Sequence, residues 1–344
     1  MTTELKHRIF RLELKNTFTI SHGSYDFRDT MIVSLKKEGI SGLGEATVIP
    51  YLGVSVEKLT KSLNKIIPLI KNLDWNHPQE LWDQLNNHLQ DDSFLLSAID
   101  CAAWDWYGKK INQPVWELLG AKPENAPLSS YTIGKDSPEI MAMKMENTPW
   151  PVYKIKIASG ADIDLIRKLR PTNDSVFRID ANCSWKVDEV YSLYAELKEL
   201  NVDLLEQPLP VGKDMHLKKE LHEPSIPVFA DESCSDIEDI EKLAPFYDGI
   251  NIKLMKCGGI TPALQMIKKA QSVGLKIMGG CMTESSVGIS AMAQLAPFFD
   301  YLDLDGALLL SNDPAEGVEV KMGKVVLSNA PGLGCFLKGN HDQL

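Results

Sequence analysis

In the first 125 residues, strand patterns come first and helix patterns follow. Apolar and polar residues alternate in Ile9–Leu14 and Met31–Lys36, as they do in half-buried strands, and Gly42–Ala46 (GLGEA) then predicts a tight turn and a short strand. Apolar residues next recur at helical spacing in three segments: Val56–Lys71, His77–Leu89 and Phe94–Lys109. Strands followed by helices predict an α+β domain, which we place at residues 1–125.

From about Ser129 the rhythm changes to short β-rich runs separated by helical patterns. Eight runs are expected to be strands: Ser130–Gly134, Val152–Ile157, Val176–Asp180, Val202–Glu206, Val228–Asp231, Gly249–Leu254, Lys276–Cys281 and Tyr301–Asp305. Helical patterns between them include Val187–Leu200, Ser235–Pro245 and Pro262–Val273. From the second run onward the repeat is roughly 24 residues, the length of one strand–loop–helix–loop unit. This alternation predicts an α/β barrel domain at residues 126–319, with residues 320–344 folding back onto the N-terminal domain.

Composition narrows the class of protein without identifying a function. The chain has 344 residues and a formal net charge of −11, which disfavours nucleic acids and anionic membranes as partners. No segment approaches the ~20 apolar residues of a membrane helix, and the charged N-terminus lacks the apolar core of a secretory signal. The 6 cysteines are scattered. We therefore expect free thiols and a cytoplasmic protein.

Ionisable residues stand at the end of almost every predicted barrel strand. Parallel barrel strands are covered on both faces, so their sequences should be almost entirely apolar. Buried charges are costly unless they compensate one another. Catalytic groups of such barrels lie at the C-terminal strand ends, and the charged residues there are Lys154, Lys156, Asp180, Glu206, Asp231, Lys253, Asp303 and Asp305.

Three of these residues form a candidate metal site. Asp180, Glu206 and Asp231 end three consecutive strands and offer the hard oxygen ligands that Mg²⁺ prefers. Any one of them alone would be better explained as a helix cap or a surface carboxylate. Their matching positions on neighbouring strands favour one Mg²⁺ site over three unrelated carboxylates.

The lysines are candidates for proton transfer. Lys154 and Lys156 lie two residues apart and therefore point to the same side of their strand. An exposed edge strand would explain the same alternation, but the repeat places this strand inside a closed barrel. Lys253, about half the ring away, would face Lys156 across the site; alternatively it belongs to a lysine-rich surface segment with Lys256. A lysine beside a divalent cation has a lowered pKa and can act as a base.

Two carboxylates follow the last predicted strand. Asp303 and Asp305 share one face and lie too far around the ring to reach the same metal. Such a pair suits a cationic group on a ligand, such as an ammonium. For Asp305 alone, a helix-capping loop is an equally good explanation.

These residues, in this order, resemble the enolase superfamily, its muconate lactonizing enzyme subgroup and, within that, the dipeptide epimerases. The resemblance covers nearly the whole chain and rests on a combination of short motifs: GLGEA, AIDCAAWDWYGKKINQPVWELLG, YKIKI, RIDANCSW, LLEQPLP, FADES, NIKLMKCGG and LDLDG. It implies a (β/α)7β barrel capped by the N-terminal region and the C-terminal tail, and an oligomeric enzyme.

The resemblance implies a role for each residue of the core. Asp180, Glu206 and Asp231 would bind one Mg²⁺, and Lys156 and Lys253 would be the acid/base pair on opposite faces of the substrate carbon. Enolase-superfamily sites combine such a base with Mg²⁺ that stabilises an ene-diolate. Two bases on opposite faces are what a 1,1-proton transfer requires, so the α-carbon would be inverted.

The remaining implied roles concern substrate binding. Lys154 would be a supporting cation near the substrate carboxylate. Asp303 and Asp305 would hold the α-ammonium of a dipeptide. Thr132 and Cys281, at the ends of the first and seventh barrel strands, match positions that line the substrate in similar epimerases.

The N-terminal loop FTISHGSYDFRD bears on which dipeptide is used. In family members acting on Ala-Glu, this loop carries an arginine for the glutamate side chain. That position here is Gly23, beside His22, and Arg28 is expected to lie too far along to reach. The loop therefore favours a small or hydrophobic second residue, as in Ala-Ala or Ala-Val with a D- or L-Ala first, over the alternative Ala-Glu.

Three other functions remain open. A cycloisomerase, an o-succinylbenzoate synthase or an N-acylamino acid racemase would share the lysines and the metal but has no need of the LDLDG aspartates. A sugar-acid dehydratase would require a histidine after the seventh strand, where this chain has GGCMTESSVG. A non-catalytic binding barrel is disfavoured because all five core residues are present.

Overall fold

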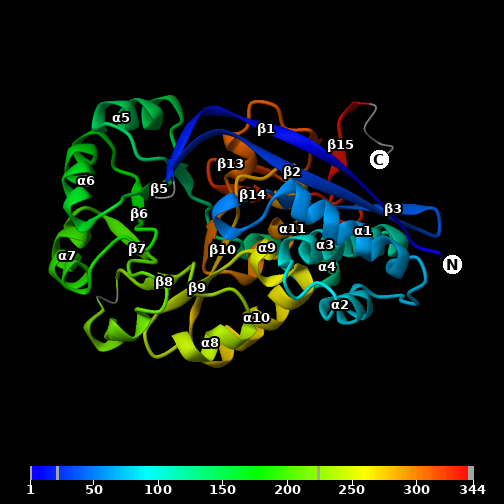
Figure 1. The fold of residues 1–344 in the computed structure, drawn as a ribbon. Helices are drawn as coiled ribbons and strands as arrows, with labels where there is room; N and C mark the ends of the chain where they lie inside the picture. The colour runs from blue at the N-terminus through cyan, green and yellow to red at the C-terminus, as the bar shows by residue number, and fades with distance from the viewer. Residues whose placement is uncertain (1, 21–22, 223–224, 340–344) are drawn as a thin grey trace.

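The N-terminal region forms an antiparallel sheet covered on one side by helices (Figure 1). The computed structural model describes residues 2–20, 23–222 and 225–339. The sheet has the order β1-β2-β3, with strands β1 (Glu4–Ile20), β2 (Gly23–Lys37) and β3 (Ile40–Thr47). The helices are α1 (Val56–Ile70), α2 (Pro78–Asn86) and α3 (Ser93–Ile111). Apolar side chains of both layers form a core of their own, as the alternating and helical patterns predict.

The first two strands are much longer than the sequence pattern indicates. Their hairpin reaches beyond the helices and over the barrel, towards the side of the molecule that holds β5 and α5 (Figure 1). The register shifts between Glu13 and Phe18, so β1 is irregular at this point. Beyond the shift, Lys135 donates a backbone hydrogen bond to Thr19, so the hairpin contacts the barrel. Apolar and polar residues alternate less regularly beyond the shift, because this part of the sheet covers a polar cavity and not a uniform apolar core.

The GLGEA segment is not the tight turn that the sequence analysis expects. It lies inside β3, and the turn precedes it at Glu38 and Gly39, which both have positive φ angles. Glycine is required at Gly44 because a Cβ atom there would lie within 2 Å of the Ala98 backbone oxygen of α3. The glycines therefore let a strand and a helix pack backbone to backbone.

The second region is the predicted barrel. Eight parallel strands follow one another in chain order: β4 (Tyr131–Ile133), β5 (Val152–Lys156), β6 (Val176–Asp180), β7 (Val202–Glu206), β8 (Val228–Ala230), β9 (Gly249–Ile252), β10 (Lys276–Gly280) and β11 (Tyr301–Asp303). Each lies within the run expected from the sequence. The ring is nearly closed by a parallel bridge between Ser129 and Leu302, supported by the 3.0 Å hydrogen bond from Ser130 N to Leu302 O.

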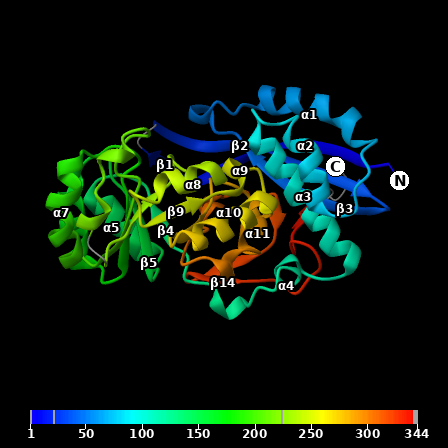
Figure 2. The same cartoon turned by 90° about the horizontal axis from the view of Figure 1, so that it is seen from below.

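Helices surround most of this ring (Figure 2). They are α5 (Pro138–Asn147), α6 (Ile163–Leu169), α7 (Val187–Glu199), α8 (Ile237–Leu243), α9 (Leu254–Cys257), α10 (Ile260–Ser272) and α11 (Ser286–Ala293); α4 (Val115–Leu118) precedes the barrel. Between β7 and β8 the described residues form only short 3₁₀ turns, at Asp214–His216 and Lys219–Leu221. Prolines at 208, 210 and 227 interrupt helix formation in that connection.

The C-terminal segment contacts both regions. β13 (Glu319–Lys321) and β14 (Lys324–Val326) form a hairpin whose Gly323 accepts a 2.8 Å hydrogen bond from Ser129 N, just before β4. β12 (Ala315–Glu316) pairs with β15 (Phe336–Leu337). Between these strands, Leu333 N donates to the Asp105 carboxylate of α3. The division into residues 1–125, 126–319 and a completing segment 320–344 remains a proposal, and the contact with α3 supports it.

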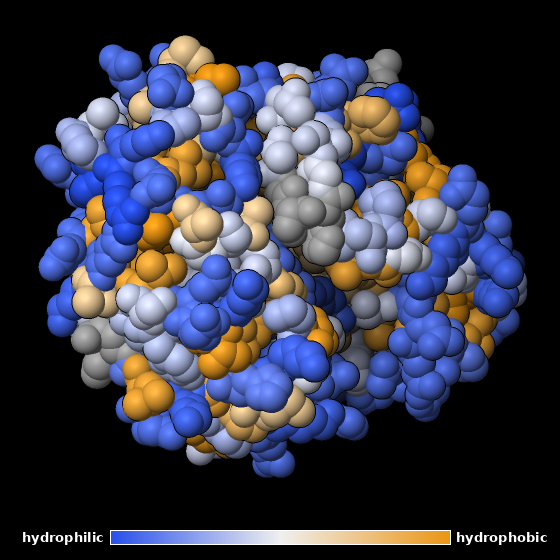
Figure 3. All heavy atoms as spheres, turned by 60° about the vertical axis from the view of Figure 1, so that its left-hand side comes forward, coloured by the Kyte–Doolittle hydropathy of each residue, from blue (hydrophilic) through white to orange (hydrophobic). Residues whose placement is uncertain are grey.

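The surface is predominantly hydrophilic on the face shown in Figure 3, with apolar side chains scattered among charged ones. No helix in the described ranges is both long enough and apolar enough to cross a membrane. All six cysteines are free thiols, in line with the sequence analysis.

Candidate active site

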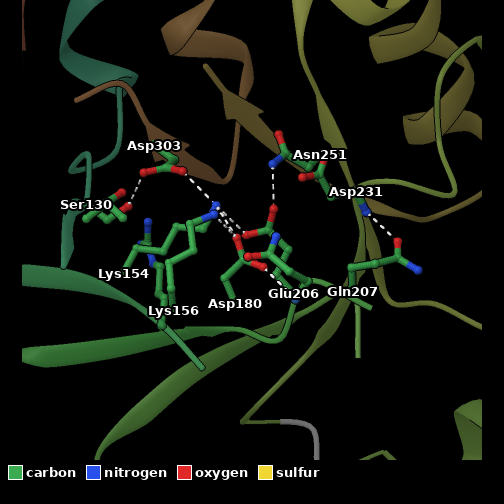
Figure 4. Close-up of polar contacts among 12 residues, drawn as sticks. Ser130, Lys154, Lys156, Asp180, Glu206, Gln207, Asp231, Asn251 and Asp303 are labelled. Atoms are coloured by element: carbon green, nitrogen blue, oxygen red, sulfur yellow. Dashed lines mark hydrogen bonds and ion pairs between the residues drawn. The ribbon is translucent and has the colours of Figure 1, made fainter. Parts of the chain in front are cut away.

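The charged residues predicted at strand ends meet at the C-terminal end of the barrel. Figure 4 shows six of them: Lys154, Lys156, Asp180, Glu206, Asp231 and Asp303. Asp180 and Glu206 end β6 and β7, and Asp231 directly follows β8. All three side chains are buried. The barrel places them together because neighbouring parallel strands end at the same rim, with Asp180 paired to Glu206 in register.

Lys154 is the most deeply buried cation of the site, with 2% of its surface exposed. Its ammonium lies 2.7 Å from Asp303 Oδ2, 2.7 Å from Glu206 Oε2 and 3.1 Å from Asp180 Oδ2. Burial lowers the pKa of Lys154, but the surrounding carboxylates raise it more, so its pKa lies well above the usual value. Lys154 is therefore a fixed positive charge between the carboxylates of β6 and β7 and the Asp303 carboxylate of β11.

The two lysines predicted to move protons contact different carboxylates. Lys156 Nζ lies 2.7 Å from Asp180 Oδ2, and Lys253 Nζ lies 2.7 Å from Asp231 Oδ2. Burial lowers both lysine pKa values, but these aspartates raise them more, and the net pKa shift is upward. Both side chains line one cavity, which also reaches Asp305. The sequence analysis expects a lowered lysine pKa only when a divalent cation lies beside the amine. The upward shift of Lys156 and Lys253 is that of the site without a cation.

Four polar partners of this core were not assigned a role from the sequence. Lys256 Nζ lies 2.6 Å from Asp231 Oδ1 and also donates to two backbone oxygens, so the lysine-rich segment belongs to the site and not to the surface. Asn251 Nδ2 donates to Glu206 Oε1 at 2.8 Å, and Gln207 Oε1 accepts from Asp231 N at 2.9 Å. Ser130 Oγ donates to Asp303 Oδ1 at 2.9 Å. Of these four residues, Asn251 could have been found from the sequence. It lies two residues before Lys253, so the alternation of side chains along a strand places both on the same face.

The carboxylate triad fits a metal ion in its chemistry. Burial and the Asp180 charge raise the pKa of Glu206 to about 8, although Lys154 opposes the shift. A cation between the carboxylates would relieve this crowding. Within the described residues no three acidic, histidine or cysteine side chains converge closely enough to hold a metal as they stand. Lysine ammoniums contact the oxygens of all three carboxylates in this structure.

A second acidic group lies across the cavity. Asp305 Oδ2 accepts a 2.6 Å hydrogen bond from the backbone N of Thr132, and Cys281 Sγ lies 3.9 Å from Asp305 Oδ1. Burial and the Asp303 charge raise the pKa of Asp305 to about 7. Asp303, Asp305, Thr132 and Cys281 all line the same cavity as the lysines. The residues expected to bind substrate are thus brought together around one cavity.

The N-terminal region forms the remaining wall of the cavity. Tyr25, Arg28 and Tyr51 line it together with the lysines. The expectation that Arg28 lies too far along the loop to reach is therefore wrong, because β2 runs over the barrel mouth. Gly23 has open space around its Cβ position, and His22 lies outside the described residues.

Glu45 fastens this N-terminal region to the barrel. Its carboxylate accepts hydrogen bonds from Thr30 Oγ1 (2.8 Å), Ser285 N (2.9 Å) and Gly288 N (2.9 Å). Ser285 caps α11, so the acidic residue of the GLGEA segment binds the N-terminus of that helix. The loop after β10, which lines the cavity, is held against β3 in this way.

Known proteins share both the sequence pattern and the fold. The family models "Mandelate racemase / muconate lactonizing enzyme, N-terminal domain" and "Enolase C-terminal domain-like" match residues 5–120 and 139–340. An L-Ala-D/L-amino acid epimerase of Flavobacterium johnsoniae is 44% identical over 96% of this chain and 98% of its own. A protein of the same description from Maribacter sp. is 45% identical, over 95% of this chain and 97% of its own.

A solved structure extends the likeness to three dimensions. The dipeptide epimerase of Methylococcus capsulatus, in complex with Mg and L-Arg-D-Lys, is 29% identical and has a TM-score of 0.90. The match covers 97% of this chain and 99% of that one. With its barrel, its capping sheet and its matches along nearly the whole sequence, the chain belongs to the mandelate racemase / muconate lactonizing enzyme family of the enolase superfamily.

Proposed function

We propose that this protein is a Mg²⁺-dependent dipeptide epimerase that inverts the α-carbon of the C-terminal residue of its substrate. The observation that carries the proposal is one cavity lined by Lys156, Lys253, Asp303 and Asp305 beside three buried carboxylates. The names of the two relatives from Flavobacterium johnsoniae and Maribacter sp., and the Mg and dipeptide in the Methylococcus structure, support it.

Asp180, Glu206 and Asp231 are the residues that would hold the Mg²⁺. Their donor set is three hard oxygens, which is typical of Mg²⁺ sites that keep positions open for substrate. When bound, the ion would supply positive charge to the substrate carboxylate and so make its α-proton more acidic. Burial and the nearby Asp180 charge raise the pKa of Glu206, and this property of the chain fits a cation at this position.

The lysines would move the proton. One of Lys156 and Lys253 removes the α-proton with its neutral amine, while the other, as an ammonium, returns a proton to the opposite face. Their separate carboxylate partners, Asp180 and Asp231, support positions on different sides of the cavity. Lys154, which stays charged, would stabilise the developing ene-diolate.

The paired aspartates would select a free N-terminus. Asp303 is already partly neutralised by Lys154 at 2.7 Å, whereas Asp305 is contacted by the Thr132 backbone N and the Cys281 thiol. A substrate ammonium would be the natural counter-ion of Asp305. N-acylamino acid racemase and o-succinylbenzoate synthase act on substrates without that ammonium, so the pair favours a dipeptide. The sequence of the N-terminal loop favours a small or hydrophobic second residue.

A dipeptide library in D₂O tests the proposal. Purified protein with Mg²⁺ is incubated with unprotected dipeptides and with their N-acetyl forms, and deuterium uptake is read by mass spectrometry. We expect uptake of one deuterium by unprotected dipeptides and little by the acetylated ones. Equal or faster uptake by the acetylated compounds would favour the racemase alternative, and no uptake by any compound would refute an epimerase.

A further inference from the structure

Glu284 is a buried carboxyl group to which the proposed reaction gives no role. It lies in the loop between β10 and α11, and 5% of its surface is exposed. Within the described residues, the only hydrogen bond to its carboxyl group comes from Met282 N, 3.3 Å from Oε1. Its Oε2 atom lies against the first turn of α11, where a Cβ atom on Gly288 would overlap it. The fold therefore leaves room for this carboxyl group without supplying the donors that would stabilise its charge.

A second buried carboxyl group, Glu45, lies beside it at the same turn of α11. Glu45 accepts hydrogen bonds from four donor groups: Thr30 Oγ1, Ser285 N, Ser285 Oγ and Gly288 N. Burial raises the pKa of Glu45, but these hydrogen bonds oppose the shift. Burial and the Glu45 charge raise the pKa of Glu284 well above its ordinary value. Of the two groups, Glu284 is therefore the one that keeps a proton at neutral pH.

Lys253 lines two cavities, and Glu284 faces the smaller of them. This cavity of ≈ 10 Å³ is bounded by Glu284, Lys253 and Cys281, among others. Its volume is about what one water molecule requires. Lys253 and Cys281 also line the larger cavity that holds Lys156. A substrate thus reaches Lys253 from one side, and Glu284 reaches it from the other, directly or through one water molecule.

A two-base inversion leaves the lysines in the wrong protonation states for a second turnover in the same direction. When Lys253 gives its proton to the α-carbon it becomes a neutral amine, while Lys156 has become an ammonium. A proton must then reach Lys253, and one must leave Lys156, before the next substrate of the same configuration reacts. Product in the larger cavity shields Lys253 from solvent on that side.

We propose that Glu284 returns this proton to Lys253. The O–H bond of Glu284 breaks and an N–H bond forms on Lys253, either directly or through a water molecule that accepts one proton and donates another. The remaining carboxylate faces the new ammonium, so the two charges compensate each other. Glu284 regains its proton from solvent and Lys156 releases the α-proton to solvent, so the number of bound protons is unchanged. This inference rests on the proposed epimerase function.

The substitution Glu284→Gln tests the proposal, because it keeps the shape of the side chain and removes the transferable proton. Initial rates are measured in both directions, with the two diastereomers of the dipeptide that reacts fastest in the D₂O library. We expect kcat to fall roughly tenfold or more in both directions, while kcat/KM, which does not depend on how the free enzyme regains its starting form, stays within about twofold. Rapid mixing should show a burst of up to one epimerised dipeptide per active site at the wild-type rate, followed by the slow steady state.

Two further measurements show that the effect comes from the missing proton. Imidazole buffer should raise kcat of Glu284→Gln with increasing concentration and leave wild-type kcat unchanged, since a diffusible acid then replaces the side chain. Glu284→Asp keeps an acid at this position and should recover part of kcat. Should Glu284→Gln not fold, Glu284→Asp carries the test alone, with a smaller loss that is confined to kcat.

Other outcomes would overturn the proposal. An unchanged kcat in Glu284→Gln would show that Lys253 regains its proton without Glu284. Equal decreases in kcat and kcat/KM, without a burst, would show that Glu284 only holds the loop after β10 in place. A wild type that epimerises no dipeptide would instead refute the proposed function itself.

Discussion

Glu206 offers a way to separate metal binding from folding. It is fully buried, Asn251 Nδ2 donates to its Oε1 and Lys154 contacts its Oε2. The substitution Glu206→Gln keeps the shape and removes the charge. Asn251 Oδ1 is a buried acceptor without a partner in the described structure, so a flip of that amide would accommodate the new NH₂ group.

The magnitude follows from the pKa of Glu206. A carboxyl with a folded-state pKa of about 8 and an ordinary value of 4.5 binds a proton more tightly in the folded state. Protonated Glu206 makes its full contribution to the free energy of unfolding below about pH 4.5, and this contribution is lost as the pH rises to about 8. At about 1.4 kcal/mol per pH unit, the ionised carboxylate destabilises the metal-free protein by roughly 3 to 5 kcal/mol at pH 8. Glutamine is neutral at every pH, so it does not destabilise the protein in this way.

Urea unfolding in EDTA and in Mg²⁺ measures both effects. In EDTA at pH 8, we expect Glu206→Gln to be at least as stable as the wild type, with the difference shrinking towards pH 5. In Mg²⁺ at about 100 times its Kd, the wild type should gain about 2.7 kcal/mol and the variant much less. Epimerase activity of the variant should be lost.

Two results would refute this reasoning. A variant several kcal/mol less stable than the wild type in EDTA at pH 8 would show that the Glu206 charge stabilises the metal-free fold. An equal gain from Mg²⁺ in both proteins would show that Glu206 does not hold the ion. A second acidic position, Asp303→Asn, serves as a control, because Asp303 is placed on the substrate and Lys154 side and should leave the Mg²⁺ effect largely intact.

Three further predictions concern catalysis, substrate binding and packing. Lys156→Ala and Lys253→Ala should each abolish inversion, measured by chiral chromatography of the product; retained inversion in either would exclude the two-base scheme. KM for unprotected dipeptides should rise as the pH falls below about 7, because Asp305 with a pKa of about 7 then loses the charge that pairs with the ammonium. Asp305→Asn should flatten this KM profile, and an unchanged profile would exclude Asp305 as its source. Gly44→Ala should destabilise the protein by about 3 kcal/mol or more in urea, since its Cβ would overlap the α3 backbone; a loss below about 1 kcal/mol would contradict that tight contact.

The barrel and its charged core were predictable because two regularities coincide. Buried parallel strands are almost wholly apolar, so a repeat of such runs locates each strand within a few residues. Asp180, Glu206 and Asp231 interrupt this rule at equivalent positions, and closure of the ring then requires them to lie together. At these three positions, the strand pattern of the sequence and the topology of the barrel both place the carboxylates at one rim.

Other features depended on contacts that sequence spacing does not reveal. Gly44 looked like a turn residue, since its close approach to α3 involves a segment more than 50 residues away. Lys256 looked like a surface lysine, because it occurs on the helical turn of α9 and only the fold turns it towards Asp231. Arg28 was judged by its distance along the loop, whereas the length and path of β2 decide where it lies. Oligomeric state and cytoplasmic location remain predictions from the sequence.

Position-specific hydrogen exchange tests the central claim most directly. L-Ala-L-Val is incubated with the protein and Mg²⁺ in D₂O, and proton NMR follows the two α-protons separately. The lysine pair flanking one carbon predicts that the α-proton of the second residue alone is replaced and that the L,D diastereomer accumulates with it. It also predicts that EDTA stops both processes. Exchange at the first residue, exchange without any inversion in the wild type, or full activity in EDTA would contradict the account.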